Sequence, residues 1–95
     1  MNDVQQRAAA AGFIHALHTS PELFNEWMGT KKDDDVAIGK LVQKTLGLAQ
    51  APDKQDLHAM ATYIDAHLKD EVTKFHAAHP TAPHHVGIAF LMQQS

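Results

Sequence analysis

Cysteine is absent from this sequence of 95 residues. Its absence excludes disulfides, thiolate catalysis and cysteine-rich zinc sites together. Membrane signals are missing as well, because no stretch approaches the roughly 18 apolar residues of a membrane span and no basic segment followed by an apolar run opens the chain. We therefore expect a cytoplasmic protein with no membrane partner.

Charge is scarce and unevenly spread. Charged residues make up 20% of the chain, and the formal net charge is −3. The pair Lys31-Lys32 is followed at once by three aspartates, so the basic cluster that nucleic-acid binding requires is missing and nucleic acid is not an expected partner. From Phe75 to Ser95 there is no Asp, Glu, Lys or Arg, although four of the eight histidines lie in this stretch.

Catalytic motifs are also lacking. The sequence contains no glycine-rich phosphate loop, no nucleophile elbow and no pair of carboxylates at a fixed structural spacing. We accordingly predict a protein that is not an enzyme, with no catalytic residue, no cofactor and no resident metal.

Helical periodicity dominates what is present. The first helix is expected at residues 3–17, Ser20 and Pro21 begin a short second helix that ends at Gly29 in the left-handed conformation, Asp33-Asp34-Asp35 begin a third that ends at Gly47, and Asp53 caps the longest one. Their expected apolar faces are Val4, Ala8, Ala11, Phe13, Ile14 and Leu17; Leu23, Phe24, Trp27 and Met28; Val36, Ile38, Leu41, Val42 and Leu46; and Leu57, Met60, Ala61, Ile64, Leu68, Val72 and Phe75.

The predicted fold is therefore all-α, a small bundle of three to four helices with an extended C-terminal tail. Pro80 and Pro83 forbid a continuous helix there. We divide the chain into a helical domain at residues 1–76, a linker at 77–83 and a tail at 84–95. The oligomeric state stays open.

Histidine pairs raise the possibility of a metal site, because imidazole is the commonest metal ligand in proteins. The candidate ligands are His15, His18, His76, His79, His84 and His85. None of these pairs has the four-residue spacing of a zincin motif, and no thiolate can assist. Solvent-facing histidines on helix rims and in a linker are the more ordinary interpretation.

The apolar C-terminal segment at residues 86–92 is unusual for a chain end. It could pack onto its own helices or pair with a second copy, or it could be presented to a partner as extended chain. A free segment with high β-propensity and no fixed charge would invite aggregation, which a partner would relieve.

A resemblance favours presentation of this segment to a partner. The stretch GFIHALHTSPELFNEW at residues 12–27, a helix ending in Leu46-Gly47-Leu48 and an acidic-capped helix from Asp53 resemble the helical leader domains of ribosomally synthesised, post-translationally modified peptides. Over residues 8–70 the pattern is similar to the binding domain of split borosin precursors and, more distantly, to the small helical subunit of protocatechuate 4,5-dioxygenase.

The borosin resemblance implies a precursor whose helical leader binds a modifying enzyme, an S-adenosylmethionine-dependent methyltransferase that methylates backbone nitrogens of the C-terminal core. The residues that match the leader pattern are Phe13, Leu17, Leu23, Trp27, Gly47 and Leu48. All of these except Gly47 would bind the partner. The modified core would comprise Val86, Gly87, Ile88, Ala89, Phe90, Leu91 and Met92. Two other functions remain open, a helical accessory subunit of a larger enzyme and a histidine-rich metal-handling protein.

Overall fold

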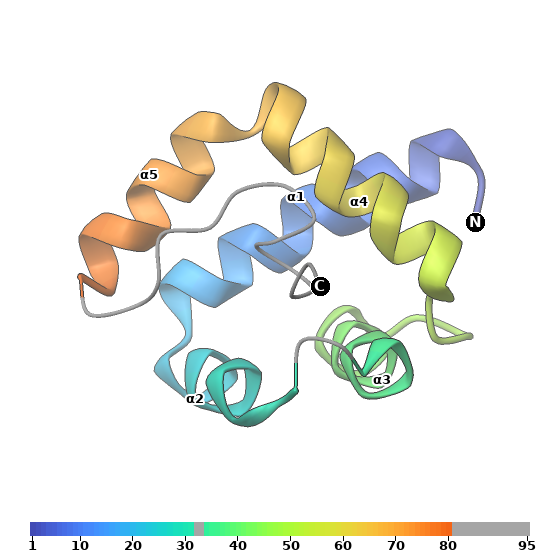
Figure 1. Cartoon of the computed structure of the whole chain (residues 1–95), viewed down its shortest axis with the longest axis horizontal. Coiled ribbons are helices and arrows are strands. Elements are labelled where there is room, and N and C mark those ends of the chain that lie inside the picture. The colour runs from blue at the N-terminus through green and yellow to red at the C-terminus, as the bar shows by residue number, and fades with distance from the viewer. Residues whose placement is uncertain (32–33, 81–95) are drawn as a thin grey trace.

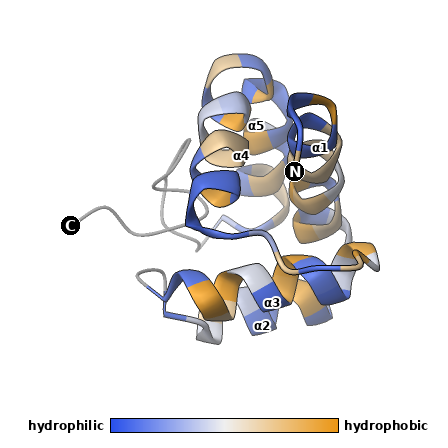
Figure 2. Cartoon of the chain, turned by 90° about the vertical axis from the view of Figure 1, so that its right-hand side faces the viewer, coloured by the Kyte–Doolittle hydropathy of each residue, from blue (hydrophilic) through white to orange (hydrophobic). Residues whose placement is uncertain are grey.

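The computed structural model describes residues 1–31 and 34–80, and this part of the chain is built from α-helices without strands. The helices are α1 (Asp3–Thr19), α2 (Pro21–Gly29), α3 (Asp35–Leu46), α4 (Lys54–His67) and α5 (Lys69–Ala78). In Figure 1, α1 crosses the middle, α4 and α5 form an arch above it, and α2 and α3 lie below. Seen from the side, α1, α4 and α5 make one layer and α2 and α3 the other (Figure 2). The predicted all-α class is confirmed for the described residues, which form five helices rather than three to four.

Helix α1 is the centre of the bundle, since it packs against each of the other four helices. Asn2 begins it through a capping box with Gln5. Its buried face is Ala9, Ala10, Phe13, Ile14 and Leu17. The expected face was wrong in its first half, because Val4 is 73% exposed and Ala8 and Ala11 also face solvent. In an alanine-rich helix the large apolar side chains decide which face is buried, and apart from Val4 those begin only at Phe13.

The connections between α1, α2 and α3 contain most of the helix caps that the sequence predicts. Ser20 ends α1 and begins α2, where its hydroxyl accepts a hydrogen bond from the Leu23 N–H and Pro21 occupies the first turn. Asp34 caps α3, and Gly47 ends it in the left-handed conformation at φ 65°. The prediction that Gly29 adopts the left-handed conformation was wrong, because the C-cap of α2 is Thr30 with extended backbone. On α3, Val36 was wrongly assigned to the buried face and is 60% exposed.

The expected longest helix is divided into α4 and α5 at Leu68, which leaves helical geometry at φ −119° and ψ 32°. Backbone hydrogen bonds persist on both sides, from the Leu68 N–H to Ile64 O at 2.9 Å and from the Val72 N–H to Leu68 O at 3.1 Å. The bend therefore loses little hydrogen bonding. It lets both helices lie against α1, as the arch in Figure 1 shows, and the predicted apolar stripe stays buried from Leu57 to Phe75 except at the half-buried Leu68.

An aromatic cluster joins α2 to α5. The Trp27 and Phe75 rings meet edge to face with centroids 5.7 Å apart, and Phe24 lies 5.7 Å from Phe75. Trp27 and Phe75 are 2% and 0% exposed. Because aromatic pairs contribute stability beyond that of their buried area, this cluster holds α5 to α2.

Within the described residues, no helix is long and apolar enough to cross a membrane.

Asp56 is a buried carboxylate that ties α4 to the start of α1. It accepts hydrogen bonds from Gln6 Nε2 at 3.0 Å and from the Asp53 N–H at 3.3 Å, and the Met1 ammonium lies 3.4 Å away. Burial alone would raise the pKa of Asp56, but these hydrogen bonds and the ammonium outweigh burial and lower it. The carboxylate therefore stays charged in the folded protein.

Gly39 on α3 allows a close approach by the connection to α4. A Cβ at this position would collide with the carbonyl oxygen of Pro52, which is backbone and cannot rotate away. A Cβ on Gly29 would meet nothing within 4 Å. The two glycines therefore make a matched pair of helix positions, one crowded and one open.

We expect Gly39→Ala to lower the free energy of unfolding by about 1–3 kcal/mol, because the added methyl group forces α3 and Pro52 apart. Gly29→Ala should leave stability unchanged or raise it by up to about 1 kcal/mol through helix propensity. Urea unfolding followed by the fluorescence of the single tryptophan measures both. Equal effects of the two substitutions would contradict the close approach at Pro52.

We expect Asp56→Asn to destabilise the fold by about 1–2 kcal/mol at neutral pH, since the amide does not replace the charged acceptor. A carboxyl with a lowered folded pKa contributes its full stability above its ordinary pKa of 3.8 and loses it as the pH falls through the folded value. The gap between parent and variant should therefore narrow below pH 3.8 in urea titrations. Asp65→Asn, an exposed change on the same helix, is the control, and a gap independent of pH would refute the assignment.

Candidate functional site

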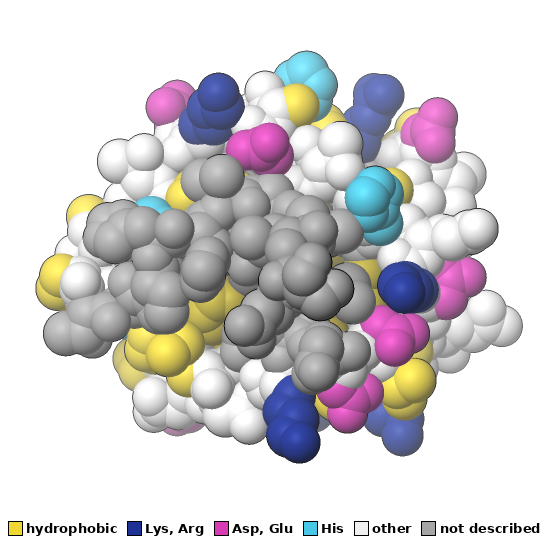
Figure 3. All heavy atoms as spheres, in the orientation of Figure 1, with side chains coloured by type: hydrophobic (Ala, Val, Ile, Leu, Met, Phe, Trp, Pro, Cys, Tyr) yellow, Lys and Arg dark blue, Asp and Glu magenta, His cyan; other side chains and the backbone are white. Residues whose placement is uncertain are grey.

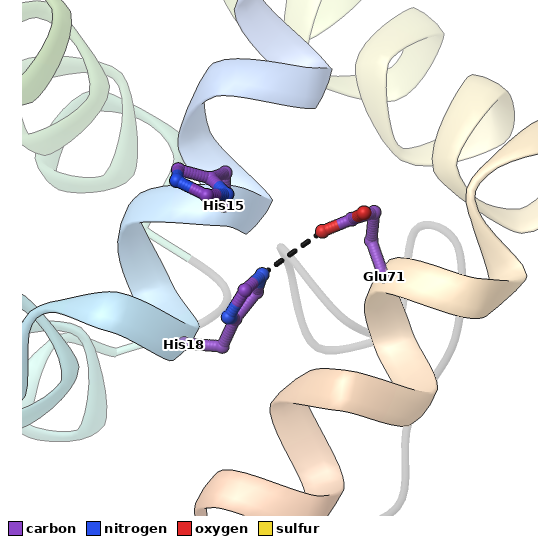
Figure 4. Close-up of side chains that lie close together, drawn as sticks. All are labelled: His15, His18 and Glu71. Carbon is purple, nitrogen blue, oxygen red and sulfur yellow. Dashed lines mark hydrogen bonds and ion pairs between the residues drawn. The ribbon is translucent and has the colours of Figure 1, made fainter.

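Three potential ligand side chains converge between α1 and α5. His15 and His18 stand three residues apart on α1, and Glu71 projects toward them from the first turn of α5 (Figure 4). One ligand atom from each residue lies within 4.8 Å of the others. His18 Nε2 is 2.9 Å from Glu71 Oε2, and the two imidazole rings meet nearly perpendicularly with centroids 5.0 Å apart. We call these three residues the His–Glu cluster.

The electrostatics of the His–Glu cluster favour a charged carboxylate. The hydrogen bond from His18 lowers the pKa of Glu71, partial burial opposes this, and Lys74, whose Nζ lies 3.3 Å from Glu71 Oε1, lowers it further. The side chains of His18 and Glu71 keep 13% and 26% of their surface exposed, and His15 is exposed. The cluster is therefore held on one side by packing and open to solvent at His15.

Of the other candidate histidines, the two that the structure describes, His76 and His79, do not join this cluster. His79 stacks on Phe24 with parallel rings 3.7 Å apart, and its Nε2 lies 3.1 Å from the carbonyl oxygen of Leu17. His76 is half-buried against Phe75. His84 and His85 lie outside the described residues. Of the four candidates among the described residues, the structure thus brings His15 and His18 together, and it adds Glu71, which no sequence motif indicated.

An apolar groove lies at the opposite end of α1. It has a volume of about 470 Å³. Its lining comes from the N-terminal residue, the first half of α1, the end of α3 and the following connection: Met1, Gln5, Ala8, Ala9, Leu46, Leu48, Ala49 and Gln50. We call it the Leu48 groove. Three of its lining residues are alanines, so the walls are short, and Leu46 and Leu48 supply the larger apolar surface.

The residues predicted to bind a partner are placed unequally. Phe13, Leu17, Leu23 and Trp27 are buried in the core, so they support the shape of the bundle and present almost no surface. Leu48 is half-buried and lines the groove. Direct partner contact by the buried four stays a prediction, and Leu48 is the member that a partner can reach.

The remaining predicted segments fall at or beyond the edge of the described chain. Helix α5 extends to Ala78, so it takes the first two residues of the expected linker at 77–83. The predicted core at residues 86–92 lies outside the described residues.

A second, more polar hollow of about 410 Å³ lies between α1 and α4, with Asp3, Gln6, Arg7, His58, Tyr63 and His67 in its lining. The Arg7 guanidinium stands over the Tyr63 ring at 5.8 Å, a cation–π contact. On the face seen in Figure 3, basic and acidic side chains of the described residues are interspersed. Such a distribution is unlike the clustered positive charge of a nucleic-acid interface.

Comparison of the chain with protein-family models, with curated proteins and with solved structures finds no match.

We predict that His79 is a structural residue that fastens the end of α5 to α1 and α2. His79→Ala should lower the free energy of unfolding by about 1–2 kcal/mol, since it removes the stack on Phe24 and the contact with Leu17 O. Thermal unfolding measured by circular dichroism tests this, with His58→Ala, an exposed histidine on α4, as the control. Equal stability of the two variants would contradict the structural role.

Proposed function

We propose that the helices form the recognition domain of a non-catalytic precursor, on which a modifying enzyme docks in order to act on residues 86–92. One observation carries the proposal: the chain joins a helical head that has an open apolar groove at Leu48 to a C-terminal stretch without a single fixed charge. Leu48 also belongs to the residues that resemble the leader pattern. The enzyme class that the resemblance suggests is an S-adenosylmethionine-dependent methyltransferase, which would meet its substrate in the cytoplasm.

The head supports this role because its core is supplied by residues well before the predicted substrate. The buried hydrophobic side chains of the described chain lie between Ala9 and Phe75. A recognition domain needs a fixed surface, and the capped helices packed around α1 supply one. The groove then gives the enzyme an apolar anchor point whose rim is formed by α1 and the connection after α3.

Composition supports the role of the C-terminal segment. An extended peptide must shed its hydration when it enters a catalytic pocket, and a segment without charges does so at low cost. Residues 79–85, between the end of α5 and Val86, can span at most about 25 Å when extended. A catalytic pocket that acts on Val86 must therefore lie within roughly that distance of the end of α5, and the limit grows by about 3.3–3.6 Å for each later position up to Met92.

The chemistry at residues 86–92 would be methyl transfer. The sulfonium of S-adenosylmethionine gives its methyl group to a backbone amide nitrogen, the N–H proton is released to a base on the enzyme, and S-adenosylhomocysteine leaves. The precursor loses a hydrogen-bond donor at each modified position, as it would with proline. An unpaired apolar strand becomes less able to pair with another copy of itself.

Co-expression of the full chain with the genes that neighbour its own tests the proposal. We expect the intact mass to rise by one methylene unit per transfer, with the added mass confined to fragments covering residues 86–92. A stable complex with an unchanged mass would refute the precursor role and indicate an accessory subunit instead. Absence of both a complex and a mass change would refute docking altogether.

A matched pair of substitutions tests the Leu48 groove. Ala8 and Ala11 are both exposed on α1, but only Ala8 lines the groove. Ala8→Glu places a charge in the groove and should weaken enzyme binding at least tenfold, a loss of about 1.4 kcal/mol, with modification reduced in parallel. Ala11→Glu is the control and should bind as the parent does. Equal binding of the two variants would move the docking surface away from the groove.

A further inference from the structure

The His–Glu cluster is a second site that the precursor role does not use. Its three side chains come from two helices. His18 and Glu71, which form a hydrogen bond, are 53 residues apart in the chain. The cluster sits at the seam of α1 and α5, while the Leu48 groove lies at the other end of α1. A ligand bound here would therefore act on the packing of α5 against α1.

We propose that His15, His18 and Glu71 form a zinc-binding site that clasps α5 to α1. Two imidazole nitrogens and one carboxylate oxygen are the protein ligands of many zinc sites that keep a fourth position for water or another ligand. The exposed side of the cluster, at His15, is where that position lies.

The distances suit the ion after a small adjustment. Zinc bonds of about 2.0–2.2 Å place neighbouring ligand atoms of a tetrahedron about 3.4 Å apart. His18 Nε2 and Glu71 Oε2 are already 2.9 Å apart, and all three ligand atoms lie within 4.8 Å of one another. Because the His15 ring is exposed, rotation about its side-chain bonds can close the remaining distance without disturbing the core.

Two neighbouring groups define the competition for this site. In the metal-free state the charged Glu71 carboxylate accepts a hydrogen bond from His18 Nε2, and Lys74 Nζ lies 3.3 Å from the other carboxylate oxygen. The Lys74 side chain is 63% exposed and can leave. Zinc would replace the His18–Glu71 hydrogen bond with two bonds to the metal, while Glu71 Oε1 stays available to Lys74.

The ligand set also distinguishes zinc from other cations. Mg²⁺ and Ca²⁺ prefer oxygen ligands, of which this cluster supplies one residue. Imidazole-rich sites take Zn²⁺, Ni²⁺ and Cu²⁺, with Cu²⁺ bound most tightly by most nitrogen and oxygen sites. Two imidazoles and one carboxylate beside a solvent-exposed position are the ligand set of zinc sites that keep a fourth position open.

Calorimetric titration of the full chain with zinc chloride tests the proposal, after EDTA treatment and dialysis. We expect one ion per chain and a higher melting temperature in zinc that EDTA reverses, because a ligand that binds only the folded state stabilises it. His15→Ala and Glu71→Gln should each weaken binding at least tenfold and abolish the zinc-dependent rise in melting temperature. His15→Ala is the decisive variant, since its exposed ring is not part of the core.

Two controls separate this site from other sources of zinc binding. His58→Ala, on the exposed side of α4, should bind zinc as the parent does. The double variant His84→Ala/His85→Ala should also retain full affinity. Loss of binding in the double variant with retention in His15→Ala would overturn the proposal, and so would the absence of any heat of binding in the parent chain.

Visible absorption of bound Co²⁺ supplies an independent readout. A tetrahedral site with nitrogen and oxygen ligands should give intense d–d bands in the parent chain and none in His15→Ala, whose helical content by circular dichroism should match the parent. Weak bands typical of octahedral, largely hydrated cobalt would overturn the proposed geometry. These measurements need no modifying enzyme, so their outcome is independent of the precursor role.

Discussion

Burial of one face of α1 is the constraint on which the rest of the structure depends. Phe13, Ile14 and Leu17 have no exposed surface, and the other four helices of the described chain all pack against α1. Complete burial of such a side chain stabilises a fold by about 1.5–3 kcal/mol relative to leaving it exposed. The remaining helices are short, and short helices are marginal in isolation, so they depend on this packing for their stability. Both the Leu48 groove and the His–Glu cluster use residues of α1, which fixes the two sites relative to each other.

Local chemistry made part of this fold predictable. Ser20 and Asp53 begin helices and Gly47 ends one where expected. Capping can be predicted from the sequence because a cap satisfies backbone groups within a few residues of itself, whatever the tertiary structure. The bend at Leu68 has no such signal. The apolar stripe runs through it without a change of spacing, and neither proline nor glycine marks it. It is set by the packing of α4 and α5 on α1, which is a property of the whole bundle.

The candidate sites were predictable to a smaller degree for the same reason. Periodicity identified Phe13 and Leu17 as apolar residues of a helix face, but it could not say whether a partner or the protein's own core would cover them, and the core does. The spacing of His15 and His18 can be seen in the sequence. Glu71 is one of several acidic residues on the predicted solvent-facing side of one long helix, so nothing in the sequence distinguishes it from the others. Only the fold brings it to 2.9 Å from His18.

The make-up of the Leu48 groove bears on how a partner could bind it. Alanine has no side-chain rotamers to lose, so the exposed Ala8 and Ala49 can be covered without the entropy cost that longer side chains impose. Short walls also bury little area each, and most of the apolar contact must then come from Leu46, Leu48 and the side chains of the partner. Specificity in such an arrangement resides in the shape of the partner's side chains. The described lining of the groove comes from residues before Phe75, so in the proposed function recognition by the helices and modification of residues 86–92 would be separate properties of one chain.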